Sequence, residues 1–162
     1  MSETGFGAPG TFSQFDQPLG HVEDNGSLVP VHPGQNADNP RSIGPAGTVH
    51  TTLNDYAKYM FAHLEGERGI PGILTVASFQ FLHTPVGDST YALGWGTDFT
   101  QTDTLGPVYD HTGSNGRWWA TVGLVPGLNV GALMVTNVAT TAAQDATDEF
   151  GQLLVERLAN SM

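Results

Sequence analysis

Apolar residues recur with helical spacing in the middle of the chain. Between residues 53 and 64 they follow the i, i+3, i+4, i+7 template of a helix with one buried face. Thr52 and Asp55 form a capping-box-like start before this run, and Gly66 is a typical stop after it. The pattern therefore predicts a helix that begins after Thr52 and ends near Gly66.

Two further helices are predicted from caps and spacing. The first covers residues 76–82, because Thr75 can cap its start and Pro85 disfavours its continuation. The second begins at residues 141–144 and runs toward the C-terminus. Its expected buried stripe consists of Ala143, Ala146, Phe150, Leu153, Leu154 and Leu158.

Strand-like runs fill the segment between the second and the last helix. Residues 91–96 indicate a strand, with glycines where the backbone is closely approached. Residues 108–119 lead into an apolar run over 120–125, which a Pro-Gly-Leu-Asn turn joins to a second run over 130–138. The expected fold class is α+β: an antiparallel sheet of three to four strands with the C-terminal helix packed on one face.

The first 47 residues show little periodicity, and an irregular opening of this length is unusual in a compact domain. We expect a long irregular connecting region over residues 1–47 and a helical segment with two helices over residues 48–88. The sheet and the C-terminal helix would follow over residues 89–162. All three parts are expected to belong to one fold unit.

Charge and composition exclude several classes of partner. The net charge is −11 with only five Lys and Arg, which argues against nucleic acid, an anionic membrane surface and phosphate-rich ligands. Cysteine is absent, so thiol chemistry and disulfides are excluded. Met1 is followed by polar and glycine residues, unlike a signal peptide, and no apolar run approaches membrane-spanning length.

Six histidines and sixteen carboxylates raise the question of a metal site. The histidines show none of the spacings typical of zinc ligands, so we expect neither a metal nor a cofactor. Ser114 is an unsuitable nucleophile, because its surroundings depart from G-x-S-x-G and lie between strands. Ser-x-x-Lys is also absent, since the only lysine, Lys58, follows Asp55 at that spacing.

What remains is the segment His111-Thr112-Gly113-Ser114 at the end of a predicted strand. Its backbone N–H groups and hydroxyls could hold a carbonyl substrate, and no bulky side chain blocks them. The simpler alternative is that Asn115-Gly116 forms a hairpin turn and His111 is a polar residue at a strand end.

Five segments, in this order, resemble the C-terminal part of the class C β-lactamase, DD-peptidase and esterase family. They are residues 4–9 (TGFGAP), 44–59 (GPAGTVHTTLNDYAKY), 91–96 (YALGWG), 111–116 (HTGSNG) and 125–127 (VPG) leading to 133–137 (LMVTN). The resemblance covers nearly the whole chain. It implies an incomplete β-lactamase-like fold, without the N-terminal helix and strands that complete the family's sheet.

The resemblance also implies roles for the candidate residues. His111-Thr112-Gly113 would correspond to the family's Lys-Thr-Gly or His-Thr-Gly motif on the strand lining the active site. His111 would supply positive character or a hydrogen bond near the substrate carboxylate or leaving group, and Thr112 a hydroxyl to the ligand. The N–H of Ser114 would be one oxyanion-hole donor.

The implied activity is that of a serine hydrolase acting on amide or ester bonds. Its nucleophilic serine, activating lysine and tyrosine are not in this sequence, so we predict no turnover by the chain alone. The alternative is a non-catalytic binding or interaction module on the same fold. Expected partners are a small-molecule or peptide substrate of the parent enzyme and, through an uncovered sheet edge or face, a second copy. Relatives are often periplasmic or secreted.

Overall fold

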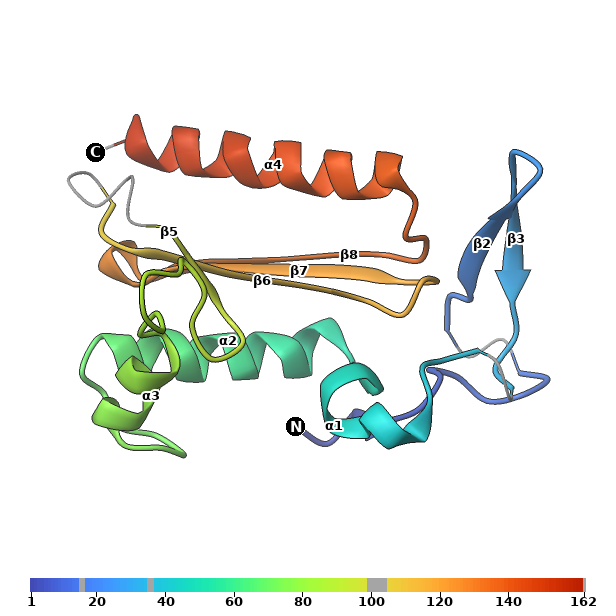
Figure 1. Ribbon diagram of the computed structural model, residues 1–162, viewed down its shortest axis with the longest axis horizontal. Helices are drawn as coiled ribbons and strands as arrows, with labels where there is room; N and C mark the ends of the chain where they lie inside the picture. Colours follow the sequence, from blue (N-terminus) through green and yellow to red (C-terminus); the bar gives the residue numbers. More distant parts are fainter. Residues whose placement is uncertain (15–16, 35–36, 99–104, 162) are drawn as a thin grey trace.

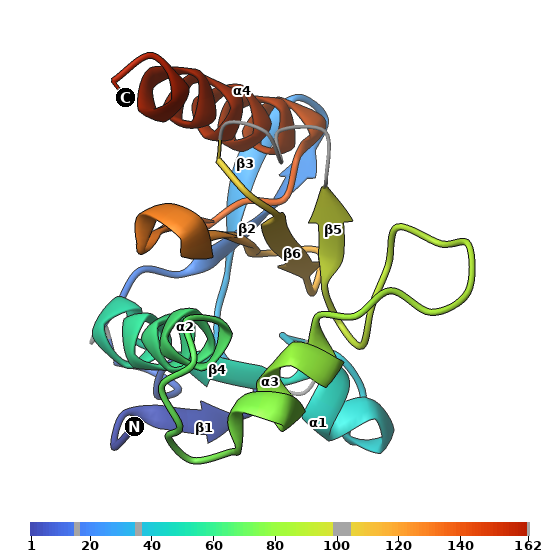
Figure 2. The same cartoon turned by 90° about the vertical axis from the view of Figure 1, so that its left-hand side faces the viewer.

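A four-stranded antiparallel sheet lies between two long helices in the computed structural model, which describes residues 1–14, 17–34, 37–98 and 105–161 (Figure 1). The strands follow one another in the order β5 (Gly96–Asp98), β6 (Val108–Ser114), β7 (Trp119–Val125) and β8 (Val130–Thr136). Helix α2 (Leu53–Glu67) covers one face and helix α4 (Thr141–Ala159) the other (Figure 2). The α+β class and the C-terminal helix on an antiparallel sheet are therefore confirmed.

The core lies between the sheet and α2. Alternate residues of a strand share one face, and the register pairs Tyr109 with Leu124 and His111 with Val122. These positions face α2, where the core is formed by Met60, Leu64, Ala92, Trp95, Tyr109, Val122 and Leu124. Burial of this apolar face is the main contribution that holds the sheet to the helical layer.

The first two predicted helices form as expected, and each is capped by the predicted threonine. The Asp55 N–H donates to Thr52 Oγ1 at 3.3 Å at the start of α2. Helix α3 (Val76–Leu82) begins after Thr75, whose Oγ1 accepts from the Ser78 N–H at 3.1 Å. A 3₁₀ turn, η2 (Pro126–Leu128), and Asn129 with φ 56° connect β7 to β8.

Helix α4 also begins as expected, but its predicted buried stripe is wrong in part. Ala146 is exposed, and Phe150 and Leu153 are 54% and 55% exposed. The helix turns a different stripe, which includes Leu154 and Leu158, to the sheet. On this side Trp119 Nε1 donates to Thr147 Oγ1 at 2.8 Å. Gly151 belongs to the same stripe and lies beside the side chain of Met134. Helix α4 thus carries a second apolar stripe on its outer side.

The strand predicted over residues 91–96 is a turn for most of its length. The Ala92 N–H donates to the Trp95 carbonyl at 2.7 Å, and Gly94 adopts φ 88° between them. Only from Gly96 onward does the backbone pair with β6. The glycine at position 94 therefore allows a reversal of direction rather than a close approach between strands.

The first 47 residues contain more regular structure than expected. They include β1 (Thr4–Phe6), β2 (Gly20–Asp24), β3 (Ser27–Val31), the 3₁₀ turn η1 (Arg41–Ile43) and the short helix α1 (Gly44–Gly47). Strands β2 and β3 form a hairpin whose turn residues, Asn25 and Gly26, have φ of 48° and 76°. Asn-Gly between extended segments is a strong hairpin signal. Strand β1 pairs with β4 (Val49–Thr51), on the α2 side of the sheet (Figure 2).

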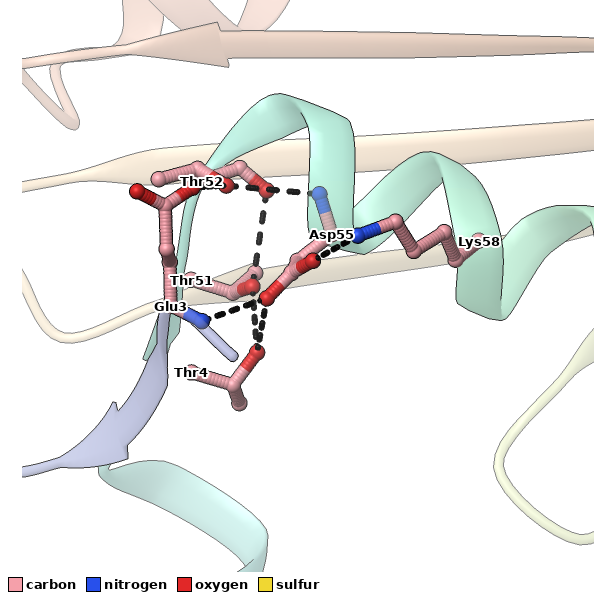
Figure 3. A network of polar contacts seen from close by, with 6 residues as sticks. All are labelled: Glu3, Thr4, Thr51, Thr52, Asp55 and Lys58. Atoms are coloured by element: carbon pink, nitrogen blue, oxygen red, sulfur yellow. Dashed lines mark hydrogen bonds and ion pairs between the residues drawn. The ribbon is translucent and has the colours of Figure 1, made fainter. Parts of the chain in front are cut away.

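A buried carboxylate attaches β1 to the start of α2 (Figure 3). Asp55 is 1% exposed, and its Oδ2 accepts from the Glu3 N–H at 2.7 Å and from Thr4 Oγ1 at 3.3 Å. Lys58 Nζ donates to Oδ1 at 2.5 Å. The hydrogen bond from Lys58 and then that from the Glu3 N–H hold the pKa of Asp55 below its usual value of 3.8. The carboxylate therefore links two segments that are about fifty residues apart.

Replacing Asp55 with Asn should release β1 while the core remains folded. The amide accepts fewer hydrogen bonds and no longer attracts Lys58, so amide hydrogen exchange in residues 4–6 and 49–51 is expected to rise about tenfold. Asp88→Asn, at an exposed loop position, is the matched control and should leave this exchange unchanged. Wild-type protection of both segments in the Asp55→Asn variant would contradict this account.

Candidate active site

The predicted site residues are the last four residues of β6. Strand β5 pairs with β6 only at Val108–Asp110, whereas β7 pairs with it from Tyr109 to Ser114. Within the described residues, the edge of β6 that faces away from β7 is therefore unpaired along His111–Ser114. Thr112, Gly113 and Ser114 are exposed and His111 is half-buried.

Backbone geometry determines which groups point to this open edge. The Thr97 N–H donates to the Thr90 carbonyl at 2.8 Å, so it points away from β6. Thr97 and its partner Tyr109 are thus a non-hydrogen-bonded pair, and the backbone groups of Asp110 point toward β5. By the alternation of an antiparallel ladder, the N–H groups of Thr112 and Ser114 point to the same side, where no strand in the described part of the chain pairs with them.

The side chains of His111 and Thr112 lie on opposite faces of the sheet. The His111 imidazole lies on the α2 side, with its ring 6.4 Å from that of Trp95. Thr112 lines a hollow of about 520 Å³ on the α4 side. The sequence predicted one ligand for both side chains, but only a ligand at the open edge could reach both. A Cβ on Gly113 would have no neighbour within 4 Å, so the space beside His111 is open.

The hydroxyl of Ser114 closes the turn that follows β6. It donates to the Trp118 carbonyl at 2.7 Å and accepts from the Gly116 N–H at 2.9 Å. Gly116 has φ 79°, a conformation that favours glycine. The hairpin turn considered as the simpler interpretation is therefore present, and it uses the hydroxyl of Ser114 while its N–H points to the open edge.

Sequence patterns missed the partners of this turn. Asn115 Nδ2 donates to Asp38 Oδ1 at 2.9 Å, and Asn115 Oδ1 accepts from the Arg117 and Trp118 N–H groups at 3.1 Å. The β2–β3 hairpin lies beside the turn, because the His21 N–H donates to the Arg117 and Asn137 carbonyls. The sequence Asn25-Gly26 is a turn signal that could have revealed the β2–β3 hairpin. No signal in the sequence indicates the contact between Asp38 and Asn115.

A buried polar network beneath β6 was also missed. His83 Nδ1 lies 2.7 Å from Glu67 Oε1, and His83 Nε2 lies 3.0 Å from His63 Nδ1. The Tyr109 hydroxyl donates to Glu67 Oε2 at 3.4 Å. The i, i+4 spacing of His63 and Glu67 on α2 places both on one helix face, which is the signal that could have revealed the pair. Among the described residues no group of three or more such side chains is arranged to hold a metal ion.

Burial shifts the pKa values in this network. Desolvation, and then the proximity of His83, lower the pKa of His63 to about 4, against a smaller opposing effect of Glu67. Desolvation, and then the charge of Glu67, raise the pKa of Tyr109 to about 12. His63 is therefore a neutral imidazole and Tyr109 a protonated phenol at neutral pH.

Comparison with known proteins relates the chain to one family. The family model described as Beta-lactamase matches residues 1–157. Penicillin-binding protein 4 from Amycolatopsis lactamdurans is 34% identical over 125 residues, which are 72% of this chain and 32% of that protein. No helix within the described residues is long and apolar enough to cross a membrane.

Two solved structures share the fold. The octameric penicillin-binding protein homologue from Pyrococcus abyssi superposes with a TM-score of 0.62 and 22% identity, over 86% of this chain and 31% of that chain. The crystal structure of SurE gives a TM-score of 0.64 and 19% identity, over 98% of this chain and 36% of that chain. The chain thus spans about a third of the length of the proteins it matches.

Acid should destabilise the fold through His63. Its folded pKa of about 4 lies below the ordinary 6.5, so the unfolded chain binds a proton more readily within this interval. The stability contributed by neutral His63 is present above pH 6.5 and is lost as the pH falls toward 4. Between pH 7.5 and 4.5 we expect the free energy of unfolding in urea to fall by about 2–3 kcal/mol from this group.

The substitution His63→Asn keeps a donor near the position of Nδ1 but does not titrate. It should remove this part of the pH dependence, although it lowers the stability at neutral pH. Gln152→Asn, at an exposed position of α4, is the control and should keep the wild-type slope. The assignment fails when the His63→Asn variant loses stability in acid as steeply as the wild type.

Proposed function

Because the chain belongs to the β-lactamase family, we propose that it forms the C-terminal part of a serine hydrolase that cleaves amide or ester bonds by acyl transfer. The open edge of β6 is the observation that carries this proposal. It brings an imidazole, a hydroxyl and two outward backbone N–H groups to one strand end. Such an edge can bind an extended substrate by backbone pairing and can also stabilise negative charge on a carbonyl oxygen.

Each residue of the motif has a distinct role in this proposal. The N–H of Ser114 donates one hydrogen bond to the oxyanion of the tetrahedral intermediate. His111 binds the substrate carboxylate or assists the leaving group from the α2 side of the strand, and Thr112 contacts the ligand from the other side. Gly113 leaves the space beside His111 unobstructed.

The nucleophile comes from outside the described site. The Ser114 hydroxyl already has a donor and an acceptor within its own turn, and attack on a carbonyl would break both contacts. We therefore propose that the chain is inactive alone and that the activity needs the part of the protein corresponding to the other two thirds of its relatives. That part would supply the nucleophilic serine and activating lysine of Ser-x-x-Lys and the family's tyrosine.

The name of the relative from Amycolatopsis suggests the first probes. Purified chain should give no turnover of nitrocefin or p-nitrophenyl acetate and no labelling by a tagged penicillin. We expect turnover once the chain is combined with a fragment of that relative carrying the missing motifs, after co-elution has established the complex. His111→Ala should then lower kcat/KM about a hundredfold, while His32→Ala should leave it unchanged.

Turnover or stoichiometric labelling by the chain alone would contradict the proposal. A complex that turns over substrate equally well with His111→Ala would remove His111 from the site. Ligand binding to a complex that never turns over would favour the alternative, a non-catalytic binding module on this fold.

We further propose that the isolated chain self-associates through surfaces left uncovered. The outer stripe of α4 presents Phe150 and Leu153, and the open edge of β6 offers unpaired backbone groups. The double substitution Phe150→Ser with Leu153→Ser should shift the sedimentation coefficient toward that of a monomer. Ala146→Ser, on the same stripe, is the control. A wild-type chain that sediments as a monomer at its highest soluble concentration would contradict this proposal.

A further inference from the structure

Four polar side chains, three of them buried and Glu67 nearly so, connect the helical layer to the strand that carries His111. His63 and Glu67 lie on one face of α2, His83 ends α3, and Tyr109 belongs to β6. His83 is 2% exposed and Tyr109 is 6% exposed. Three hydrogen-bonding contacts join these four residues, so the network spans the three elements that meet beneath the candidate site.

The carboxylate of Glu67 sets the direction of the hydrogen bonds. Ionised Glu67 only accepts, so Nδ1 of His83 carries the proton in the 2.7 Å contact with Oε1. In neutral His83 the Nε2 atom then accepts, and Nδ1 of His63 donates to it. The Tyr109 hydroxyl donates to the other oxygen of Glu67. Each contact thus has one donor and one acceptor, and both His83 and Tyr109 are oriented by the same carboxylate.

Ring contacts continue the network toward His111. The His83 ring stacks on Tyr109 with 4.4 Å between centroids, and it meets Trp95 edge-on at 5.0 Å. Trp95 in turn contacts His111 at 6.4 Å. Tyr109 and His111 are two residues apart on β6 and therefore lie on the same face. The orientation of His83 thus affects the strand directly before the candidate motif.

Strand β6 needs this support because its end is held on one edge only. Beyond Asp110 its backbone pairs with β7 and no longer with β5. Its position against α2 then depends on contacts of the α2-facing side chains, chiefly Tyr109 and the neighbouring Trp95. Buried ionic groups add little stability compared with an apolar core, but a fully paired network fixes one arrangement of the elements that it joins.

We propose that Glu67 and His83 are positioning residues, which hold β6 through Tyr109 and Trp95 so that His111 and the outward N–H of Ser114 face the substrate together. This inference rests on the proposed function for the role of His111. The placement of the strand is measured without a substrate, whereas the role of His111 is tested by turnover. Failure of one is therefore distinguishable from failure of the other.

The test is nuclear magnetic resonance of the full chain carrying Glu67→Gln. The amide keeps the shape of the side chain but loses the charge that orients His83. We expect the Overhauser contact between the Trp95 and His111 rings to weaken about twofold or more. Amide exchange at residues 111–114 should rise about tenfold, while β8 keeps its wild-type protection. Glu65→Gln, an exposed carboxylate on the same helix, should change neither signal.

A purely structural role would lower the free energy of unfolding but leave the ring contact of the folded molecules at wild-type intensity. That result in Glu67→Gln overturns the proposal. Should this variant fail to fold, Tyr109→Phe decides, because it removes one hydroxyl and keeps the stacked ring. A weaker ring contact and faster exchange at residues 111–114 in this variant support the proposal, and wild-type values for both overturn it.

Discussion

The packing of Tyr109 on β6 against the helical layer is the constraint on which the candidate site depends. Tyr109 fills the core with Val122 and Leu124, and the next residue on the same face is His111. The core and the candidate site therefore lie on the same face of β6, the core at Tyr109 and the site from His111 onward. Any change that moves β6 relative to α2 to improve packing also moves the imidazole and the backbone N–H groups at the open edge.

The face of the sheet toward α4 is only partly covered. Strands in a sheet lie about 4.8 Å apart and a helix is about 10 Å wide, so one helix covers about two strands. Helix α4 lies over β7 and β8, and a Cβ on Gly123 of β7 would have no neighbour within 4 Å. The hollow beside α4 has this origin. A sheet of four strands provides more apolar surface than a single helix can bury.

Local signals predicted the elements whose formation depends on local chemistry. Thr52 and Thr75 cap their helices as expected, because a cap needs only a side-chain oxygen and the next turn of backbone. The stripe of α4 was mispredicted because two apolar stripes run along that helix, and spacing alone cannot tell which one meets the sheet. The hydrogen bond from Trp119 Nε1 to Thr147 Oγ1 favours the observed side, and it is a tertiary effect.

The candidate site shows the same division. The sequence placed His111 to Ser114 at a strand end, where the structure has them, but it could not assign the two side chains to opposite faces or find Glu67 and His83 beneath them. These contacts join residues of α2, α3 and β6 that are 16 and 42 positions apart, so no short window of sequence contains them. Only the i, i+4 pair of His63 and Glu67 leaves a local trace.

The hydrogen bonds of the Ser114 hydroxyl indicate that β6 contributes backbone groups to the candidate site. Its hydroxyl is held in the turn, while its N–H points to the unpaired edge. A strand that binds a ligand through backbone N–H groups must be placed accurately, because an N–H group cannot reorient without moving the backbone. The identity of its side chains matters less. The position of such a strand must be fixed by the layer against which it packs. The carboxylate of Glu67 orients both the His83 imidazole and the Tyr109 phenol and so favours one position of β6. The buried polar network and the open strand edge are therefore two parts of one arrangement.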